Sequence, residues 1–244
     1  MSFHAEPMKK KATYYSIKEA TFRLKTNKED PEAQLREYTN PKTKEEGVAY
    51  ERVYKFMCGL ITDISFVDST LKDGTILRNL HINLGENDDG ISQIISLGVD
   101  DRYATDFMKR LPQIDLTKEV RLTPYDFEKD GPRRVGISVA QKDEADNFTV
   151  AIGNNFFTKV EGEGTEKKYT NLHGYPEPTE DDSSDWPFYF KRVSKFLIAY
   201  TKENVLPKLE AGARSGIPHS SPIPRSYEEE HKNDDFSDPS QIPF

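Results

Sequence analysis

Cysteine is almost absent from this chain of 244 residues, in which Cys58 is the one example. A single thiol excludes an internal disulfide framework and a cysteine zinc site, and it is typical of a reducing, intracellular compartment. Histidine is also sparse, and the five histidines stand singly at His4, His81, His173, His219 and His231. Because metal centres need clustered ligands, we expect neither a bound metal nor another cofactor.

Long apolar runs are missing as well. No stretch approaches the roughly 18 apolar residues that a membrane span requires. The N-terminal sequence MSFHAEPMKKK has no apolar region of the kind found in signal peptides. We therefore expect a soluble, cytoplasmic protein with no membrane partner.

Catalytic motifs are the third absence. The sequence contains no P-loop, no nucleophile elbow and no H-E-x-x-H motif, and the Gly-Glu-Gly at 162–164 lies in a charged segment. Asp126, Glu128 and Lys129 could serve a metal-dependent nuclease, but their spacing is also that of an ordinary charged turn. We expect a protein that is not an enzyme.

Acidic residues outnumber basic ones, and the excess is concentrated at the C-terminus. Residues 227–244 contain six acids and one lysine, which is −5 of the formal net charge of −8, so residues 1–226 carry −3. Nucleic acid demands Lys and Arg at its binding surface. A nearly balanced body can still present a basic face.

Strand patterns dominate from residue 50 onward. Runs rich in aromatic and β-branched residues occupy 50–67, 75–84 and 91–99, and Asp-Gly pairs at 73–74 and 89–90 mark the turns between them. A helix is predicted over 100–114, since Tyr103, Phe107, Met108 and Leu111 recur at helical spacing between a cap at Asp100 or Asp101 and a stop at Pro112. Two further strands, 119–128 and 133–141, follow with a third Asp-Gly between them, and 147–152 adds another.

Three strands, one helix and two strands form the order of an OB-fold, a five-stranded barrel that binds oligonucleotides or oligosaccharides. An SH3-like barrel or an antiparallel sandwich remains an alternative. The residues 13–25 are expected to add one or two strands, and the polar segment 26–47 a long loop or a short helix. The fold class expected is mainly β.

A C-terminal helix is predicted over 185–209, with Ser184 or Asp185 as its cap. It is expected to place one apolar face on the barrel or on a second subunit, which makes a homodimer possible, through Phe190, Val193, Phe196, Leu197 and Tyr200. The domain plan is then a basic arm at 1–12, the barrel with its helix at 13–209, a flexible linker at 210–226 and an acidic tail at 227–244.

The last eleven residues, DDFSDPSQIPF, combine acids with an apolar end. A barrel, a Pro-containing linker and such a tail resemble the single-stranded DNA-binding proteins of bacteria and their phages, whose bacterial members end in aspartates followed by Ile-Pro-Phe. Here Ser240 and Gln241 separate the acids from Ile-Pro-Phe, the linker lacks a Gly and Gln tract, and the body is larger. These departures fit a phage-encoded member, in a bacterial cell or a phage-infected host.

The resemblance implies that the tail recruits replication or recombination enzymes, such as a polymerase, helicase, primase or exonuclease. Phe244 would be the anchor, with Ile242 and Pro243 as its support and with acidic guides at Asp234, Asp235 and Asp238. The alternative is a tail that only keeps the protein soluble, which explains the acids but not the terminal Phe.

Single strands are held by aromatic platforms and by Lys or Arg along the backbone. The candidate contacts on the predicted strands are Arg52, Tyr54, Phe56, Arg78, His81, Arg121, Tyr125, Phe127, Arg133 and Arg134. For any one aromatic residue, core packing is the alternative. The sequence therefore predicts a sequence-independent single-stranded DNA binder in replication, recombination or repair, and as an alternative an adaptor whose barrel does not bind DNA.

Overall fold

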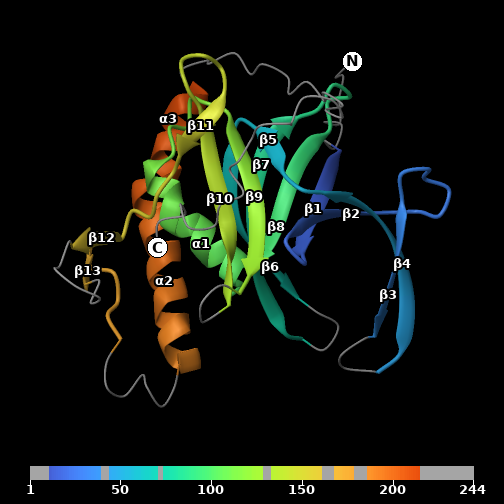
Figure 1. Cartoon of the computed structure of the whole chain (residues 1–244), viewed down its shortest axis with the longest axis horizontal. Helices are drawn as coiled ribbons and strands as arrows, with labels where there is room; N and C mark the ends of the chain where they lie inside the picture. Colours follow the sequence, from blue (N-terminus) through green and yellow to red (C-terminus); the bar gives the residue numbers. More distant parts are fainter. Residues whose placement is uncertain are drawn as a thin grey trace, which may run out of the picture.

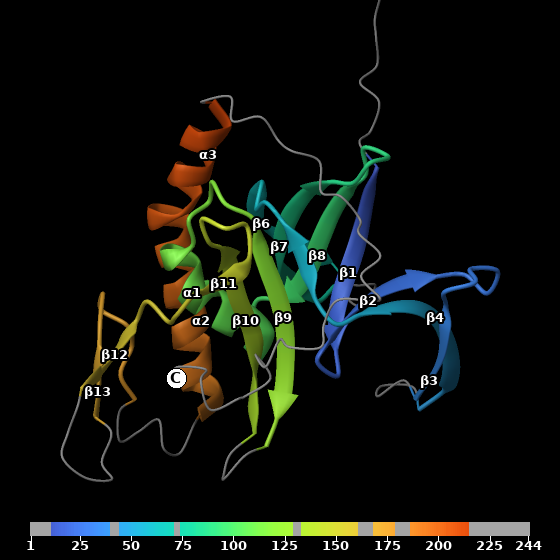
Figure 2. The same ribbon diagram turned by 45° about the horizontal axis from the view of Figure 1, so that its top comes forward.

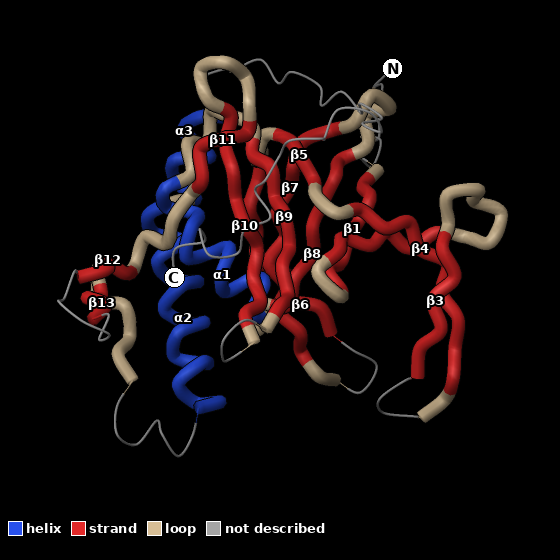
Figure 3. The backbone as a smooth tube through the Cα atoms, viewed as in Figure 1, coloured by secondary structure: helices blue, strands red, loops and turns tan. Residues whose placement is uncertain are grey.

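The computed structural model describes residues 11–39, 44–70, 74–128, 133–160, 168–178 and 186–214. Strands before the first helix are β1 (Ala12–Lys18), β2 (Thr21–Thr26), β3 (Gln34–Thr39), β4 (Glu46–Tyr54), β5 (Met57–Gly59), β6 (Asp63–Thr70), β7 (Ile76–Glu86) and β8 (Ser92–Gly98). After α1 (Arg102–Arg110) come β9 (Val120–Phe127), β10 (Arg134–Lys142), β11 (Phe148–Ala151), β12 (Phe157–Val160), β13 (Lys168–Asn171), α2 (Trp186–Asn204) and α3 (Leu206–Arg214). Figures 1 and 3 show the helices gathered between β9 and β10 on one side and the β12–β13 pair on the other.

Two sheets enclose the core. One sheet has the order β3-β4-β2-β1-β8-β7-β6, the other has the order β11-β10-β9-β5, and β12 pairs with β13 separately. Strands that lie side by side in these sheets pair antiparallel, except β1 and β8, which pair parallel. Fully buried side chains between the sheets include Phe22, Leu80, Ile82, Ile95, Leu122 and Ile137.

The helix predicted after the third strand is confirmed as α1. The Asp101 carboxylate caps it by accepting a hydrogen bond from the Tyr103 backbone N–H at 2.9 Å. Phe107 and Met108 are fully buried, and Pro112 lies in the short 3-10 turn that follows. Apolar residues at helical spacing, a cap and a stop are sufficient to predict this helix because all three signals are local.

The Asp106 side chain on α1 closes the open edge of β10. Its carboxylate accepts hydrogen bonds from the Ile137 backbone N–H at 2.9 Å and from the Tyr125 hydroxyl at 3.1 Å. It also pairs at 3.2 Å with Arg110, a buried cation that donates to the Ile152 carbonyl at 2.7 Å. A side chain of α1 therefore accepts the hydrogen bond of a β10 backbone N–H that a neighbouring strand would otherwise accept.

Replacing Gly136 with alanine tests this junction. A Cβ at 136 would meet the Asp106 carboxylate and the Tyr125 hydroxyl well inside van der Waals distance. We expect a loss of about 1 to 3 kcal/mol in unfolding free energy, as for other overpacked sites, measured by urea denaturation. Gly98, where an added Cβ would meet nothing within 4 Å, provides the control, and equal stability of the two variants would contradict the packing described.

The C-terminal helix is confirmed in part. Val193 and Leu197 are buried, and the Ser194 hydroxyl donates to the Val99 carbonyl at 2.9 Å, which fixes α2 to the end of β8. Phe190 does not pack on the body, because it is 56% exposed, and its neighbour Tyr189 is buried instead. Contact of this face with a second subunit stays a prediction. The helical segment also continues past the predicted end at 209, since α3 reaches Arg214.

Residues 26–47 depart from the predicted loop or short helix. They contain β3, which pairs antiparallel with β4 from Gln34↔Glu51 to Thr39↔Glu46. The buried Glu51 carboxylate accepts two hydrogen bonds from Arg36, both at 2.8 Å, and one from Arg23 at 3.1 Å. The three strands β2, β4 and β3 form an arm that projects from the body in Figures 1 and 2, and this β2–β4–β3 arm therefore has a charged centre. The strands expected in 13–25 are confirmed as β1 and β2.

The mainly β class is confirmed. The strands predicted at 75–84, 91–99, 119–128 and 133–141 are present as β7, β8, β9 and β10 with α1 after β8, whereas the predicted strand 50–67 is divided among β4, β5 and β6. Closure into a barrel is not shown. In the part of the chain that the structure describes, β8 pairs with β1 and β7, β10 pairs with β9 and β11, and no ladder joins β8 to β10. None of the described helices is long and apolar enough to cross a membrane.

Candidate nucleic-acid interface

The outward side of β9 is the first element of the candidate interface. Successive side chains of a strand point to opposite faces. Val120, Leu122 and Pro124 are buried against the core, so Arg121, Thr123, Tyr125 and Phe127 point to the other face, where all four are partly exposed. The predicted residues Arg121, Tyr125 and Phe127 therefore share one face.

Phe148 extends this face across β10. It is paired with Lys142 through an irregular register at the β10–β11 turn. The Arg121 guanidinium lies 5.7 Å and the Lys142 ammonium 5.5 Å from the centre of its ring. Lys142 is also held by Glu119 at 2.7 Å. Two cations thus flank one aromatic ring.

Tyr125 and Phe127 form a second aromatic pair on the same face. Their ring centres are 5.7 Å apart with an angle of 44° between the planes. Burial, and then the Asp106 carboxylate, raise the pKa of Tyr125 above its usual range, which keeps its hydroxyl a hydrogen-bond donor. Gly136 and Arg134 lie opposite Tyr125 and Phe127 in the β9–β10 register, so the predicted Arg134 also belongs to this face.

We call this surface the β9–β11 face, and it is made of Arg121, Tyr125, Phe127, Arg134, Lys142 and Phe148. From Arg121 to Phe127 it spans about 20 Å, at roughly 3.3 Å per strand residue. Two cations flank Phe148 at one end of it, and the Tyr125–Phe127 pair lies at the other. Such an arrangement can stack bases and hold phosphates without reading base edges.

Other predicted contacts lie elsewhere. Arg52, on the β2–β4–β3 arm, donates to both oxygens of Asp30 at 2.6 and 2.9 Å, and these bonds lower the pKa of Asp30 to about 2. Tyr54 packs edge-on against Tyr15, with 5.8 Å between ring centres. Phe56 is 40% exposed and directly precedes β5, the strand beside β9.

Arg78 and His81 lie on opposite faces of β7, because they are three residues apart on one strand. Arg78 donates to both oxygens of Asp68 at 2.7 and 2.8 Å. His81 contacts Tyr14 edge-on, with 5.6 Å between ring centres, and burial lowers its pKa. This Tyr14–His81 pair is on the outer side of the large sheet and provides a second aromatic surface to compare.

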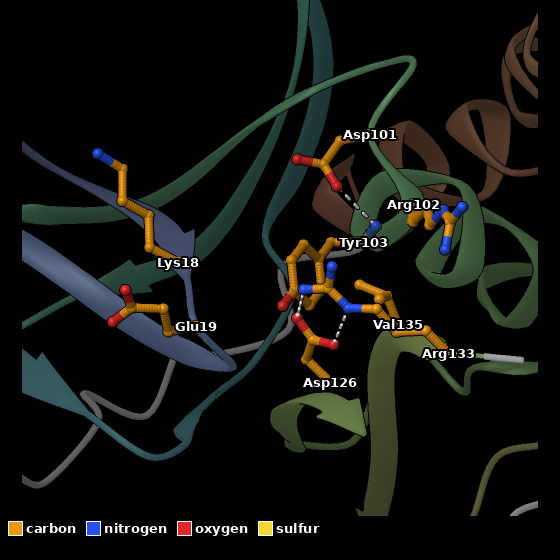
Figure 4. Close-up of a pocket in the computed structure, with 8 residues that line it drawn as sticks. All are labelled: Lys18, Glu19, Asp101, Arg102, Tyr103, Asp126, Arg133 and Val135. Carbon is orange, nitrogen blue, oxygen red and sulfur yellow. Dashed lines mark hydrogen bonds and ion pairs between the residues drawn. The ribbon is translucent and has the colours of Figure 1, made fainter. Parts of the chain in front are cut away.

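Arg133 lies at the rim of a hollow of about 540 Å³ between the β1–β2 turn, the start of α1 and the β9–β10 hairpin, drawn in Figure 4. Its guanidinium donates to Asp126, with a nitrogen to oxygen distance of 2.6 Å. Cations and acids are equal in number among the lining residues, as Lys18, Arg102 and Arg133 against Glu19, Asp101 and Asp126. The hollow therefore offers no net charge to a ligand.

The tail residues Asp234, Asp235, Asp238, Ile242, Pro243 and Phe244 lie outside the described residues, as does Lys129 of the nuclease alternative. Asp126, the first acid of that alternative, is engaged by Arg133. Among the described side chains, no group of three His, Cys, Asp or Glu residues is placed to hold a metal ion.

Sequence reasoning missed Phe148, Lys142 and Asp106. The alternation in β9 identifies one face of one strand, but the register of β10 with β11 decides what lies beside it. The sequence signal that could have identified Phe148 is its position directly after the polar turn 143–147. In the structure the Asp143 carboxylate accepts hydrogen bonds in this turn from the backbone N–H groups of Ala145 and Asn147. Comparisons with family models, curated proteins and solved structures found no match.

Proposed function

We propose that this protein binds single-stranded DNA without sequence preference and coats it during replication, recombination or repair. The observation that carries the proposal is the β9–β11 face, where Arg121 and Lys142 flank Phe148 beside the Tyr125–Phe127 pair. Every base has an aromatic surface, so stacking of this kind tolerates any sequence.

The topology supports an OB-fold as the scaffold. The segment from Met57 to Thr70 pairs first with β9, through β5, and then with β7, through β6. A first strand shared between the two halves, a helix after the third strand and a partly open barrel are features of that fold. In an OB-fold, ligands also bind on strands 2 and 3. These strands correspond here to β7 and β8, so the Tyr14–His81 pair beside them is an alternative surface for stacking bases.

The tail supplies the second part of the proposal. The C-terminal Ile242, Pro243 and Phe244 would bind a replication or recombination enzyme, with the preceding aspartates guiding the encounter. This is the chemistry of the bacterial and phage single-stranded DNA-binding proteins that the tail resembles, and a phage-encoded member is our proposal for its origin.

A gel shift with a dT oligonucleotide tests the DNA-binding proposal. We expect a complex whose affinity falls steeply with salt, because bound phosphates release counterions. A duplex of the same length should bind more weakly, since its bases are not free to stack. Absence of any complex at low salt would overturn the proposal.

The second candidate is an adaptor whose body does not touch DNA. Its support is that three of the predicted arginines are already held by carboxylates, as Arg52 with Asp30, Arg78 with Asp68 and Arg133 with Asp126. An adaptor would capture its enzyme partner through the tail but give no shift with the oligonucleotide.

Replacing Asp126 with asparagine should release Arg133, next to Arg134 at the end of the β9–β10 pair, for a phosphate contact. We expect the plot of log affinity against log salt concentration to become steeper by about 0.7, the value for one further phosphate on a single strand. Fluorescence anisotropy of a labelled dT oligonucleotide measures this slope. Asp68→Asn, which breaks the matched pair with Arg78 away from the β9–β11 face, should leave the slope unchanged. The reverse pattern would place the DNA nearer β7.

A further inference from the structure

Phe56 lies on the same side of the four-stranded sheet β11-β10-β9-β5 as the β9–β11 face. In the antiparallel β5–β9 pair, Cys58 is opposite Arg121, and Met57 is opposite Leu122. Residues directly opposite each other share one face of a sheet. Met57 packs on the core with the buried Leu122, so Cys58 points to the other face. By alternation Phe56 does so as well, and its side chain is 40% exposed.

The surroundings of Cys58 support this placement independently. Burial raises the pKa of its thiol to about 11, and the charges of Arg121 and Lys142 act in the opposite direction. Both cations therefore lie near the thiol. Since the same two cations flank Phe148, Cys58 lies beside the cationic end of the β9–β11 face.

Phe56 stands beside the gap between the two ends of the β9–β11 face. The β5–β9 register, extended by two residues, sets Phe56 opposite Thr123, midway between Arg121 and Tyr125. At roughly 4.8 Å between strands and 3.3 Å per residue, the Phe56 Cα is about 8 Å from the Cα atoms of Arg121 and Tyr125. Thr123 is paired with Ser138 on β10, so the middle of the face has small side chains next to one exposed ring.

We propose that Phe56 is the central stacking platform of the site, so that a single strand passes from Phe148 across β10 and β9 to Phe56, and from there to the Tyr125–Phe127 pair. This inference rests on the proposed single-strand binding and adds the path that the strand takes. Base stacking on successive aromatic rings needs no base-edge contact. The two cations beside Phe148 are placed to hold phosphates where the strand enters this path.

The path has a consequence for Cys58. A strand stacked on both Phe148 and Phe56 passes beside the thiol, because Cys58 is in register with Arg121 and only two residues from Phe56. A strand that ran directly from Phe148 to Phe127, along β10 and β9, would leave the β5 side uncovered. Cys58 is the single cysteine of the chain, so its alkylation reports on this position alone.

Phe56→Ala should weaken binding of a dT oligonucleotide about tenfold, as expected for the loss of one stacked base. Phe56→Leu, which keeps an apolar side chain at the site, should lose nearly as much. Tyr38→Ala is the matched control, because Tyr38 is 43% exposed and has the Arg36 guanidinium 5.1 Å from its ring centre, but lies on the β2–β4–β3 arm. Its affinity should stay within about twofold of the wild-type value. Anisotropy measures binding, and thermal unfolding verifies that each variant is folded.

The second measurement is the rate at which N-ethylmaleimide alkylates Cys58, followed by the mass of the intact protein. Saturating dT oligonucleotide should slow the reaction several-fold, and protein alkylated beforehand should bind the oligonucleotide more weakly.

Two results would overturn the path while leaving the proposed function in place. One is wild-type affinity of both Phe56 variants when the double variant Phe127→Ala with Phe148→Ala has lost binding. The other is an alkylation rate of Cys58 that bound DNA does not change. Absence of any complex between the wild-type protein and the oligonucleotide would instead overturn the proposed function, and the path with it.

Discussion

Replacing Phe127 and Phe148 together with alanine is expected to weaken single-stranded DNA binding about thirtyfold or more. Each base stacked on an aromatic ring contributes roughly 1 to 3 kcal/mol, and 1.4 kcal/mol corresponds to tenfold in affinity. Both rings belong to the β9–β11 face and are only partly buried, so their loss should spare the core. Tyr125 is left intact because its hydroxyl joins β9 to Asp106 on α1.

The matched control is the double variant Tyr14→Ala with His81→Ala, which removes the ring pair on the outer side of the large sheet. Its affinity for a dT oligonucleotide, measured by anisotropy, should stay within about threefold of the wild-type value, less than half a decade. Thermal unfolding would verify that both double variants are folded. If the Tyr14 and His81 variant loses binding instead, DNA lies on the β7–β8 side and our choice of face is wrong.

Deleting Phe244 should abolish the capture of a replication or recombination enzyme from a lysate of the native host. A buried aromatic anchor commonly contributes 2 kcal/mol or more to an interface, and adding one residue after Phe244 should be equally harmful because it moves the carboxylate. Affinity for single strands should change by no more than about twofold, since the tip is not part of the β9–β11 face.

Phe236 provides an internal control for that deletion, since it lies in the same acidic tail eight residues before the end. Phe236→Ala keeps the terminal ring and carboxylate, so the same enzyme should still be captured. Retention of the partner without Phe244 would reduce the tail to a solubilising segment.

The sequence predicted well wherever the signals were local. Asp-Gly turns and alternation identified β7, β8, β9 and β10, and the cap at Asp101 with Pro112 beyond identified α1, because each signal lies within a few residues of the element. Parity along β9 likewise placed Arg121, Tyr125 and Phe127 on one face. The same rule applied to β7 shows that Arg78 and His81 lie on opposite faces, because they are an odd number of residues apart on one strand.

The errors concern information that lies between segments. Periodicity located the apolar face of α2 but not where the body beneath it stops, so it could not show that Phe190 is exposed while Val193 and Leu197 are buried. The charged strand β3 exists through its pairing with β4 and the burial of Glu51 among arginines, which no propensity in 26–47 shows. The Arg52–Asp30 and Arg78–Asp68 pairs depend on strand geometry in the same way.

The parallel pairing of β1 with β8 has a consequence for synthesis of the chain. Tyr14 pairs with Ile94, about 80 residues later, and a ribosome adding 5 to 20 residues per second needs roughly 4 to 16 s to cover that separation. During this interval β1 can pair only with β2, its antiparallel neighbour in the chain. The order of translation therefore makes the large sheet assemble as two pieces, an early β1–β2 hairpin joined by β4 and a later β6–β7–β8 meander, which meet only when β8 has emerged.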